Sequence, residues 1–167
     1  MKYDLCQSSW DENERKAILE VISGNTYTMG KKVSDYEEAF AVKFGSRYAV
    51  MVNSGSSANL AAVAALAYSK RVQAGDEVIV PAVSWSTTYF PLYQFGLKLV
   101  FVDIDADTYC INVEELRAAV TEKTKLIVAV NLLGNASEYK EILSICSEAG
   151  AILLEDNCES MGALYDG

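Results

Sequence analysis

The sequence contains no histidine, and no C-x-x-C pair occurs among its four cysteines, Cys6, Cys110, Cys146 and Cys158. Zinc sites of the Cys/His type depend on such closely spaced ligands, so we expect no metal site in this chain. The lack of histidine also excludes a Ser-His or Cys-His nucleophile built from this chain alone. We therefore interpret the cysteines as buried, reduced thiols.

Long apolar runs and positive charge are also scarce. No apolar run reaches the roughly 18–20 residues that span a bilayer, and residues 1–6 lack the apolar core of a signal peptide, so we expect a cytoplasmic protein. The chain has 14 Lys and Arg against 23 Asp and Glu, a net charge of -9. Such a surface cannot neutralise a polyanion, which argues against nucleic acid or an anionic membrane as partner.

The N-terminal residues predict a helical segment, which we place at 1–45. The pattern Ser9-x-x-Glu12 is typical of a capping box and predicts a helix that ends at Gly24. A loop is expected over residues 25–31, and an amphipathic helix over Val33–Phe44.

Residues 46–167 alternate between short apolar runs and helical stretches, the latter at 56–71, 84–95, 112–120 and 137–149. Asn112 with Glu115 predicts a capped helix start. Continuous apolar strands separated by helices indicate an α/β fold, with a mostly parallel sheet covered by helices on both faces. The runs expected to form strands are Tyr48–Val52, Glu77–Val80, Leu97–Val102, Leu126–Val130 and Ala151–Leu154.

The residues that follow these runs suggest a ligand site, because open α/β sheets bind ligands beyond the carboxyl ends of their strands. After the first run, Gly55, Ser56 and Ser57 open a helix whose free N–H groups could hold a phosphate. The alternative is a plain capped turn. The segment matches neither the dinucleotide fingerprint nor the P-loop.

Three more residues lie at expected strand ends. Trp85 could stack on a flat ring, although a core tryptophan is the alternative. Asp156 could pair with a protonated ring nitrogen, or it could cap the next turn. Asn131 would point into the same crevice.

Together these segments resemble the sugar-nucleotide aminotransferases of the DegT/DnrJ/EryC1/StrS family, which are fold-type-I enzymes that use pyridoxal phosphate (PLP). The resemblance implies that Ser56 and Ser57 hold the PLP phosphate, that Trp85 stacks on the pyridine face, and that Asp156 keeps the pyridine nitrogen protonated. Glu159 replaces the Gln or His usual near the ring hydroxyl, and Asn131 replaces a frequent His. The resemblance covers nearly the whole chain, and its matching stretches are Tyr27–Gly30, Tyr48–Leu60, Gly75–Pro81, Val102–Asp105 and Leu154–Asp156.

The implied function is PLP-dependent transfer of an amino group, with glutamate as donor, to a nucleotide-linked keto-sugar in amino-sugar biosynthesis. The implied assembly is a homodimer with shared active sites, in which Tyr27 and Lys31 contact substrate; the alternative is that residues 25–31 form an ordinary surface loop. An alternative is a PLP-dependent keto-sugar 3-dehydratase, because the sequences of Asn131–Asn135 and Asp156–Glu159 look like those of that branch of the family. Enzymes of that branch carry His in place of the Schiff-base lysine.

A third possibility is a non-catalytic fragment or binding module. By resemblance the Schiff-base lysine would follow Gly167, and Lys98 and Lys125 begin strands at the wrong end of the sheet, so we expect an N-terminal portion that is inactive alone. The family's strand order, 3-2-4-5-6-7-1, would leave Tyr48–Val52 without a partner and Ala151–Leu154 with one open edge. Neither run contains a charge or a proline to protect it.

Overall fold

The computed structural model describes residues 8–166, so Cys6 and Gly167 lie outside the described residues. Contacts between residues divide the chain into two units with a boundary between Met51 and Val52, a few residues beyond the boundary expected from sequence. Each unit is described by itself. No helix within the described residues is long and apolar enough to cross a membrane.

The first unit contains two helices, α1 (Glu12–Ser23) and α2 (Lys31–Lys43). The predicted capping box is wrong by two residues, because Asp11 and not Ser9 caps α1. The Asp11 carboxylate accepts a hydrogen bond from the Asn13 N–H at 2.6 Å, and the Asp11 N–H donates to Glu14 Oε2 at 2.7 Å. A charged cap gains from the helix dipole, which a serine hydroxyl does not.

The predicted loop ends one residue early, since Lys31 already belongs to α2 and pairs with Asp35 at 2.7 Å.

Residues 48–52 form no strand, contrary to expectation. No strand pairs with them in the described part of the chain, and the Met51 N–H instead donates to the Glu37 carboxylate at 2.7 Å. Without a neighbouring strand the apolar character of this run is not sufficient to make it a β-strand.

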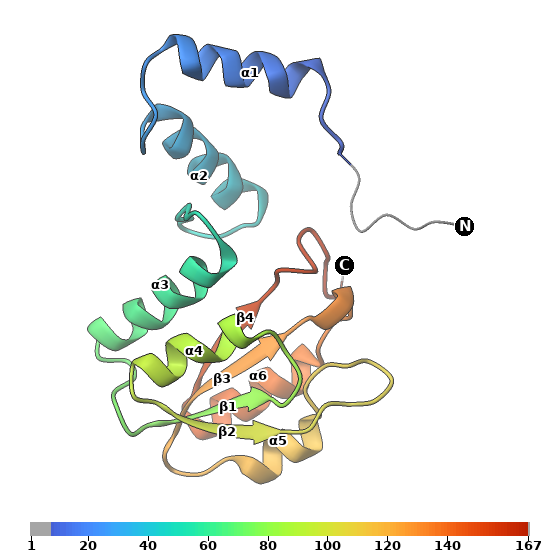
Figure 1. Cartoon of the computed structure of the whole chain (residues 1–167). Helices are drawn as coiled ribbons and strands as arrows, with labels where there is room; N and C mark the ends of the chain where they lie inside the picture. The colour runs from blue at the N-terminus through green and yellow to red at the C-terminus, as the bar shows by residue number, and fades with distance from the viewer. Residues whose placement is uncertain (1–7, 167) are drawn as a thin grey trace. The chain divides into compact units, whose positions relative to one another are not determined.

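The second unit is an α/β layer structure, as predicted (Figure 1). Four parallel strands lie in the order β2-β1-β3-β4, which matches the 3-2-4-5 part of the order expected from the resemblance. Its elements are α3 (Gly55–Tyr68), β1 (Glu77–Pro81), α4 (Ser86–Gln94), β2 (Lys98–Val102), α5 (Val113–Ala119), β3 (Thr124–Val130), the 3₁₀ turn η1 (Leu132–Gly134), α6 (Tyr139–Ala149) and β4 (Ile152–Asp156).

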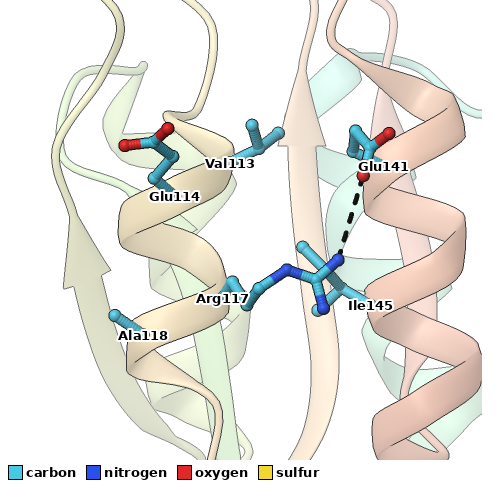
Figure 2. A pocket seen from close by; sticks show the side chains of 6 residues that line it. All are labelled: Val113, Glu114, Arg117, Ala118, Glu141 and Ile145. Atoms are coloured by element: carbon cyan, nitrogen blue, oxygen red, sulfur yellow. Dashed lines mark ion pairs between the residues drawn. The ribbon is translucent and has the colours of Figure 1, made fainter.

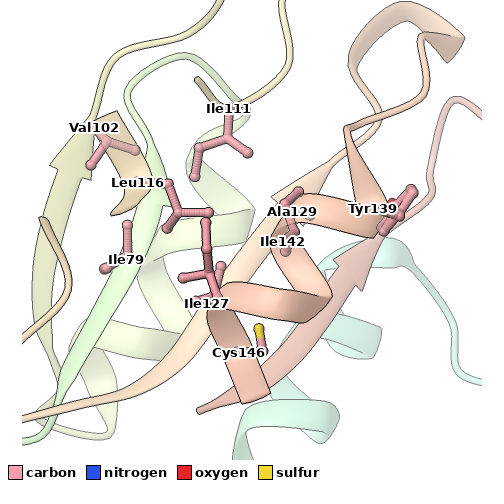
Figure 3. Packing of buried hydrophobic residues seen from close by; sticks show 10 residues of the cluster. Ile79, Val102, Ile111, Leu116, Ile127, Ala129, Tyr139, Ile142 and Cys146 are labelled. Carbon is pink, nitrogen blue, oxygen red and sulfur yellow. The ribbon is translucent and has the colours of Figure 1, made fainter. Parts of the chain in front are cut away.

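Helices cover both faces of this sheet, as the apolar strands predicted. Alternate residues of β3 point to opposite faces: Ile127 packs with α5 and α6, and Leu126 packs with α3 and α4. Figure 3 shows the first of these clusters, in which Leu116 of α5 and Ile142 of α6 cover the sheet. Packed helices therefore exclude water from both faces of the sheet, and a polar ligand site is expected at the strand ends.

The edge strand β4 differs from the sequence interpretation at both ends, and it begins one residue later than expected, at Ile152. It runs two residues further than expected and includes Glu155 and Asp156. Glu155 is its exposed residue, whereas every residue of the neighbouring β3 except Lys125 is buried. The edge strand is thus better protected against pairing with another chain than Ala151–Leu154 alone suggested, because its carboxyl end carries the charged Glu155.

Candidate functional site

The carboxyl end of β4 carries a carboxylate that is held by three parts of the second unit. Oδ2 of Asp156 accepts hydrogen bonds from Thr88 Oγ1 of α4 at 2.9 Å and from Asn59 Nδ2 of α3 at 3.1 Å. Oδ1 accepts a longer one, 3.3 Å, from the Cys158 N–H. The capping role considered as the alternative is therefore present on Oδ1, but the stronger contacts are tertiary.

These contacts keep Asp156 ionised although it is half-buried. Burial raises the pKa of this carboxyl, but the hydrogen bonds from Asn59, Thr88 and Cys158 together lower it by more, so the pKa lies below its ordinary value. A negative charge at the end of a buried strand can pair with a cationic ligand group.

The start of α3 combines the two interpretations made from sequence. Ser54 caps the helix, since its hydroxyl accepts the Ser57 N–H at 3.2 Å. In the described residues no hydrogen bond involves the Gly55 and Ser56 N–H groups, and a side chain added at Gly55 would meet open space. Two N–H groups and the helix dipole are thus available to an anion, while the N–H of Ser57 serves the cap.

Trp85 is not part of the core. It precedes α4 and 74% of its surface is exposed, so its indole is free to contact a ligand.

Asn131 makes hydrogen bonds only within the protein. Its amide donates to Asn157 Oδ1 at 2.6 Å and to Ser160 Oγ at 3.3 Å, and its oxygen accepts from the Ser137 N–H at 3.1 Å and from the Tyr139 hydroxyl at 3.0 Å. Burial raises the pKa of Tyr139, so this hydroxyl stays protonated and can donate. All four hydrogen-bonding positions of the amide are occupied, and Asn131 ties the loop after β3 to the loop after β4.

Glu159 makes a second link between the same loops. Its carboxylate accepts a hydrogen bond from the N–H of Leu133, which has a left-handed backbone with φ of 56°. A carboxylate bound there stabilises a turn that a leucine adopts only at a cost.

Two of the three described cysteines are buried, as predicted for Cys110 and Cys146, but Cys158 is exposed. Cys158 lies in the turn after β4, outside the core. Although the residue is exposed, partial desolvation of its thiol and the neighbouring Asp156 raise the pKa of Cys158 to about 11, so the thiol is protonated near neutral pH.

Tyr27 and Lys31 belong to the first unit, and both make local contacts. The Tyr27 hydroxyl lies 2.9 Å from the carbonyl oxygen of Ile22, and Lys31 pairs with Asp35. Lys98 and Lys125 lie in the second unit at the amino ends of β2 and β3, opposite to Asp156, as predicted.

A hollow of about 500 Å³ lies elsewhere, between α5 and α6 (Figure 2). Its cation, Arg117, is already paired with Glu148 at 2.8 Å and with Glu141 at 3.8 Å. It contains none of the residues predicted for the site, and its single cation is already paired with carboxylates. We therefore assign the functional site to the strand ends.

Asn59 and Thr88 were not identified from sequence as site residues, although both lie in segments that were singled out. Asn59 is the one polar residue after the first turn of an otherwise apolar α3 until Tyr68, which was a usable signal. Thr88 offered none, because nothing in the sequence shows that its hydroxyl meets a residue 68 positions later.

The residues present fit PLP. An ionised, oriented carboxylate suits a protonated pyridine nitrogen, free N–H groups at a helix start suit a phosphate, and an exposed indole suits an aromatic ring. No group of three or more His, Cys, Asp or Glu side chains within the described residues is placed to hold a metal ion.

Comparisons with known proteins agree with this fit. The model of the DegT/DnrJ/EryC1/StrS aminotransferase family matches residues 8–167. The chain is 55% identical over 99% of its length to GDP-4-keto-6-deoxy-D-mannose 3-dehydratase of Escherichia coli O55:H7, and 54% identical to that of Yersinia pseudotuberculosis. It spans 43% of the length of each of these relatives.

Solved structures give the same result. The E. coli dehydratase with bound hydrated PLP has a TM-score of 0.95 and 54% identity over 99% of this chain and 43% of its own. A 3-amino-5-hydroxybenzoic acid synthase, at 29% identity over 95% of this chain and 41% of its own, has a TM-score of 0.87.

Proposed function

Since the chain belongs to the DegT/DnrJ/EryC1/StrS aminotransferase family, we propose that it provides the PLP site of an enzyme that dehydrates a GDP-linked 4-keto-6-deoxy sugar at C3. One observation carries the choice of reaction. The two 3-dehydratases are 55% and 54% identical to this chain, whereas GDP-perosamine synthase of Vibrio cholerae is 32% identical. This order reverses the one inferred from sequence, where aminotransfer came first.

Asp156, the start of α3 and Trp85 would divide the binding of the cofactor between them. Asp156 would hold a proton on the pyridine nitrogen, and the N–H groups of Gly55 and Ser56 would bind the phosphate. Trp85 would stack on the ring. Bound PLP supplies an electron sink for bonds next to the carbon that carries the amine.

Asn131 and Glu159 would act indirectly in this proposal. Their side chains bind the loops after β3 and β4 to each other, and so they fix the backbone from which Asp156 projects. This differs from the direct cofactor contacts inferred from the resemblance, because the four hydrogen-bonding positions of the Asn131 amide are already occupied.

The substrate and partners are inferred from the relatives. A variant of the related dehydratase holds GDP-perosamine, and another structure of that enzyme contains PLP with glutamate. We extend to this chain a nucleotide-sugar substrate and glutamate as amino donor. The homodimer, the substrate contacts of Tyr27 and Lys31 and the cytoplasmic location are part of the same proposal.

Aminotransfer to a keto-sugar is the second candidate. It is favoured by relatives such as the UDP-2-acetamido-2-deoxy-3-oxo-D-glucuronate aminotransferase of Pseudomonas aeruginosa, at 34% identity. The residue at the position of the Schiff-base lysine distinguishes the two reactions, since histidine there favours dehydration and lysine favours aminotransfer. This chain contains no histidine, and Lys98 and Lys125 lie at the end of the sheet opposite to Asp156, so we propose that it is inactive alone.

The test uses a chimera of the two proteins, the joined protein, in which this chain replaces the matching 43% of the E. coli dehydratase. We expect it to consume GDP-4-keto-6-deoxy-D-mannose with loss of the C3 hydroxyl. Mass spectrometry of the sugar measures this loss. Asp156→Ala should lower turnover by at least about 100-fold, because it removes the charge opposite the ring nitrogen.

The neighbouring substitution Glu155→Ala is the control, since it removes an exposed carboxylate from the same strand. It should leave turnover within about threefold, as expected for a surface change. A folded joined protein that transfers an amino group to the sugar would contradict the dehydration, and an active Asp156→Ala variant would contradict the cofactor site.

A further inference from the structure

We infer that Asn59 and Thr88 are positioning residues, which hold Oδ2 of Asp156 and so direct its Oδ1 at the pyridine nitrogen of PLP. This inference rests on the proposed function and assigns roles to two residues on different helices. Neither residue need touch the cofactor for the inference to hold.

The first argument is the unequal use of the two carboxylate oxygens. Oδ2 accepts two side-chain hydrogen bonds of 2.9 and 3.1 Å, and Oδ1 accepts a single backbone bond of 3.3 Å. Each ionised carboxylate oxygen has two lone pairs, so Oδ2 is saturated and Oδ1 retains an acceptor position. A cationic N–H ligand would therefore bind at Oδ1.

The second argument is that the direction of the hydrogen bond from Thr88 can be assigned. Thr88 Oγ1 lies 2.9 Å from Asp156 and 3.2 Å from Ser84 Oγ. An ionised carboxylate can only accept, so the Thr88 proton points to Asp156, and Ser84 must donate to Thr88. The threonine is 4% exposed, which keeps water from competing for this relay.

The third argument concerns Asn59, which lies one helical turn after Gly55 on α3. One turn of α-helix spans about 5.4 Å along the axis. The helix that offers its first N–H groups to the phosphate thus also holds the carboxylate that meets the ring. The distance between the two ends of the cofactor site is therefore fixed by a rigid element and not by a loop.

The experiment removes one donor at a time in the joined protein. Thr88→Val deletes the hydroxyl with little change in shape, and Thr88→Ser restores it. Thr87→Val is the matched control, because it makes the same change one residue earlier, and within the described residues the Thr87 side chain makes no hydrogen bond with Asp156. Asn59→Leu tests the second donor.

The first measurement needs no cofactor. The pKa of the Asp156 carboxyl is followed by carbon-13 NMR in protein labelled at aspartate and assigned against Asp156→Asn. Both donors hold this pKa down, so it should rise in Thr88→Val and in Asn59→Leu. It should stay unchanged in Thr88→Ser and Thr87→Val.

The second measurement compares dissociation constants for PLP and for its analogue with C–H in place of the ring nitrogen. The unsubstituted protein should prefer PLP by about tenfold or more, as expected for a hydrogen bond between charged groups. Thr88→Val should lose most of this preference while its affinity for the analogue changes by less than about twofold.

The possible failures are distinguishable. If the unsubstituted protein shows no preference for PLP, the pairing of Asp156 with the ring nitrogen is wrong, and with it the proposed site. If that preference is present but survives in Thr88→Val and Asn59→Leu, with the Asp156 pKa unchanged, only the positioning roles are wrong. An equal effect of Thr87→Val would also overturn them.

Discussion

Individual side chains around Asp156 show which site residues a sequence can indicate. Asp156 and Trp85 could be proposed as site residues because each follows an apolar run, and the rule that ligands bind at strand ends uses only that order. Asn59 and Thr88 were not, because they meet Asp156 from 97 and 68 positions away. Asn131 was placed correctly at a strand end, but its four internal partners follow from loop geometry that no local pattern encodes.

Cys158 gives a prediction at this scale. Its thiol has a pKa of about 11, raised by partial desolvation and by the adjacent Asp156, so it should react slowly with iodoacetamide at pH 8. Asp156→Asn removes the negative charge that opposes the thiolate, which lowers the pKa of Cys158. We therefore expect faster alkylation of Cys158 in that variant at pH 8, measured by peptide mass spectrometry.

Cys158→Ser identifies the reactive site, since the other described cysteines, Cys110 and Cys146, are buried. An alkylation rate of Cys158 that is the same with and without the Asp156 carboxylate would show that the two groups are not coupled.

Helices and strands were largely predictable, because their periodicity and end signals are local. Asn112 caps α5 as predicted, and Gly150 ends α6 with φ of 64°, a conformation that favours glycine. The cap of α1 was misplaced because Ser9 and Asp11 each precede a glutamate by three positions. The strand at Tyr48–Val52 was wrong because a strand needs a partner, which composition does not reveal.

The loops after β3 and β4 give a prediction at the scale of elements. Asn131→Ala removes four hydrogen bonds and leaves the buried Ser137 N–H and Tyr139 hydroxyl without their acceptor. We expect the free energy of unfolding to fall by about 2–6 kcal/mol, since each of these two unsatisfied buried groups costs about 1–3 kcal/mol. Urea denaturation followed by far-UV circular dichroism measures it.

Asn135→Ala is the matched control, because Asn135 is exposed and its amide makes one hydrogen bond, to the Thr108 carbonyl oxygen at 2.9 Å. Its cost should stay below about 1 kcal/mol. Equal losses in the two variants would mean that Asn131 does not link the loops in the way its contacts indicate.

For the whole molecule, the order of the strands came from the resemblance and not from physical reasoning on composition. Parallel strands require long crossovers, and several orders satisfy that requirement equally. The observed order β2-β1-β3-β4 agrees with the family's, and it places β4 at an edge. Both edges of the sheet leave backbone N–H and C=O groups without a strand partner in the described residues.

This arrangement predicts self-association of the 167-residue chain when it is produced alone. The Tyr48–Val52 run is apolar, belongs to no helix or strand of the described residues, and has Val50 74% exposed, so it can add to the open edge of β4 in another copy. We expect a sedimentation coefficient that rises with concentration.

Val50→Lys should reduce this association, because a charge at an edge position opposes strand addition. Val42→Lys is the control, since Val42 is equally exposed, at 78%, but lies on helix α2. If both lysine variants reduce association equally, general hydrophobicity and not strand pairing drives it. If the unsubstituted chain stays monomeric at high concentration, the exposed edges are harmless and the prediction is wrong.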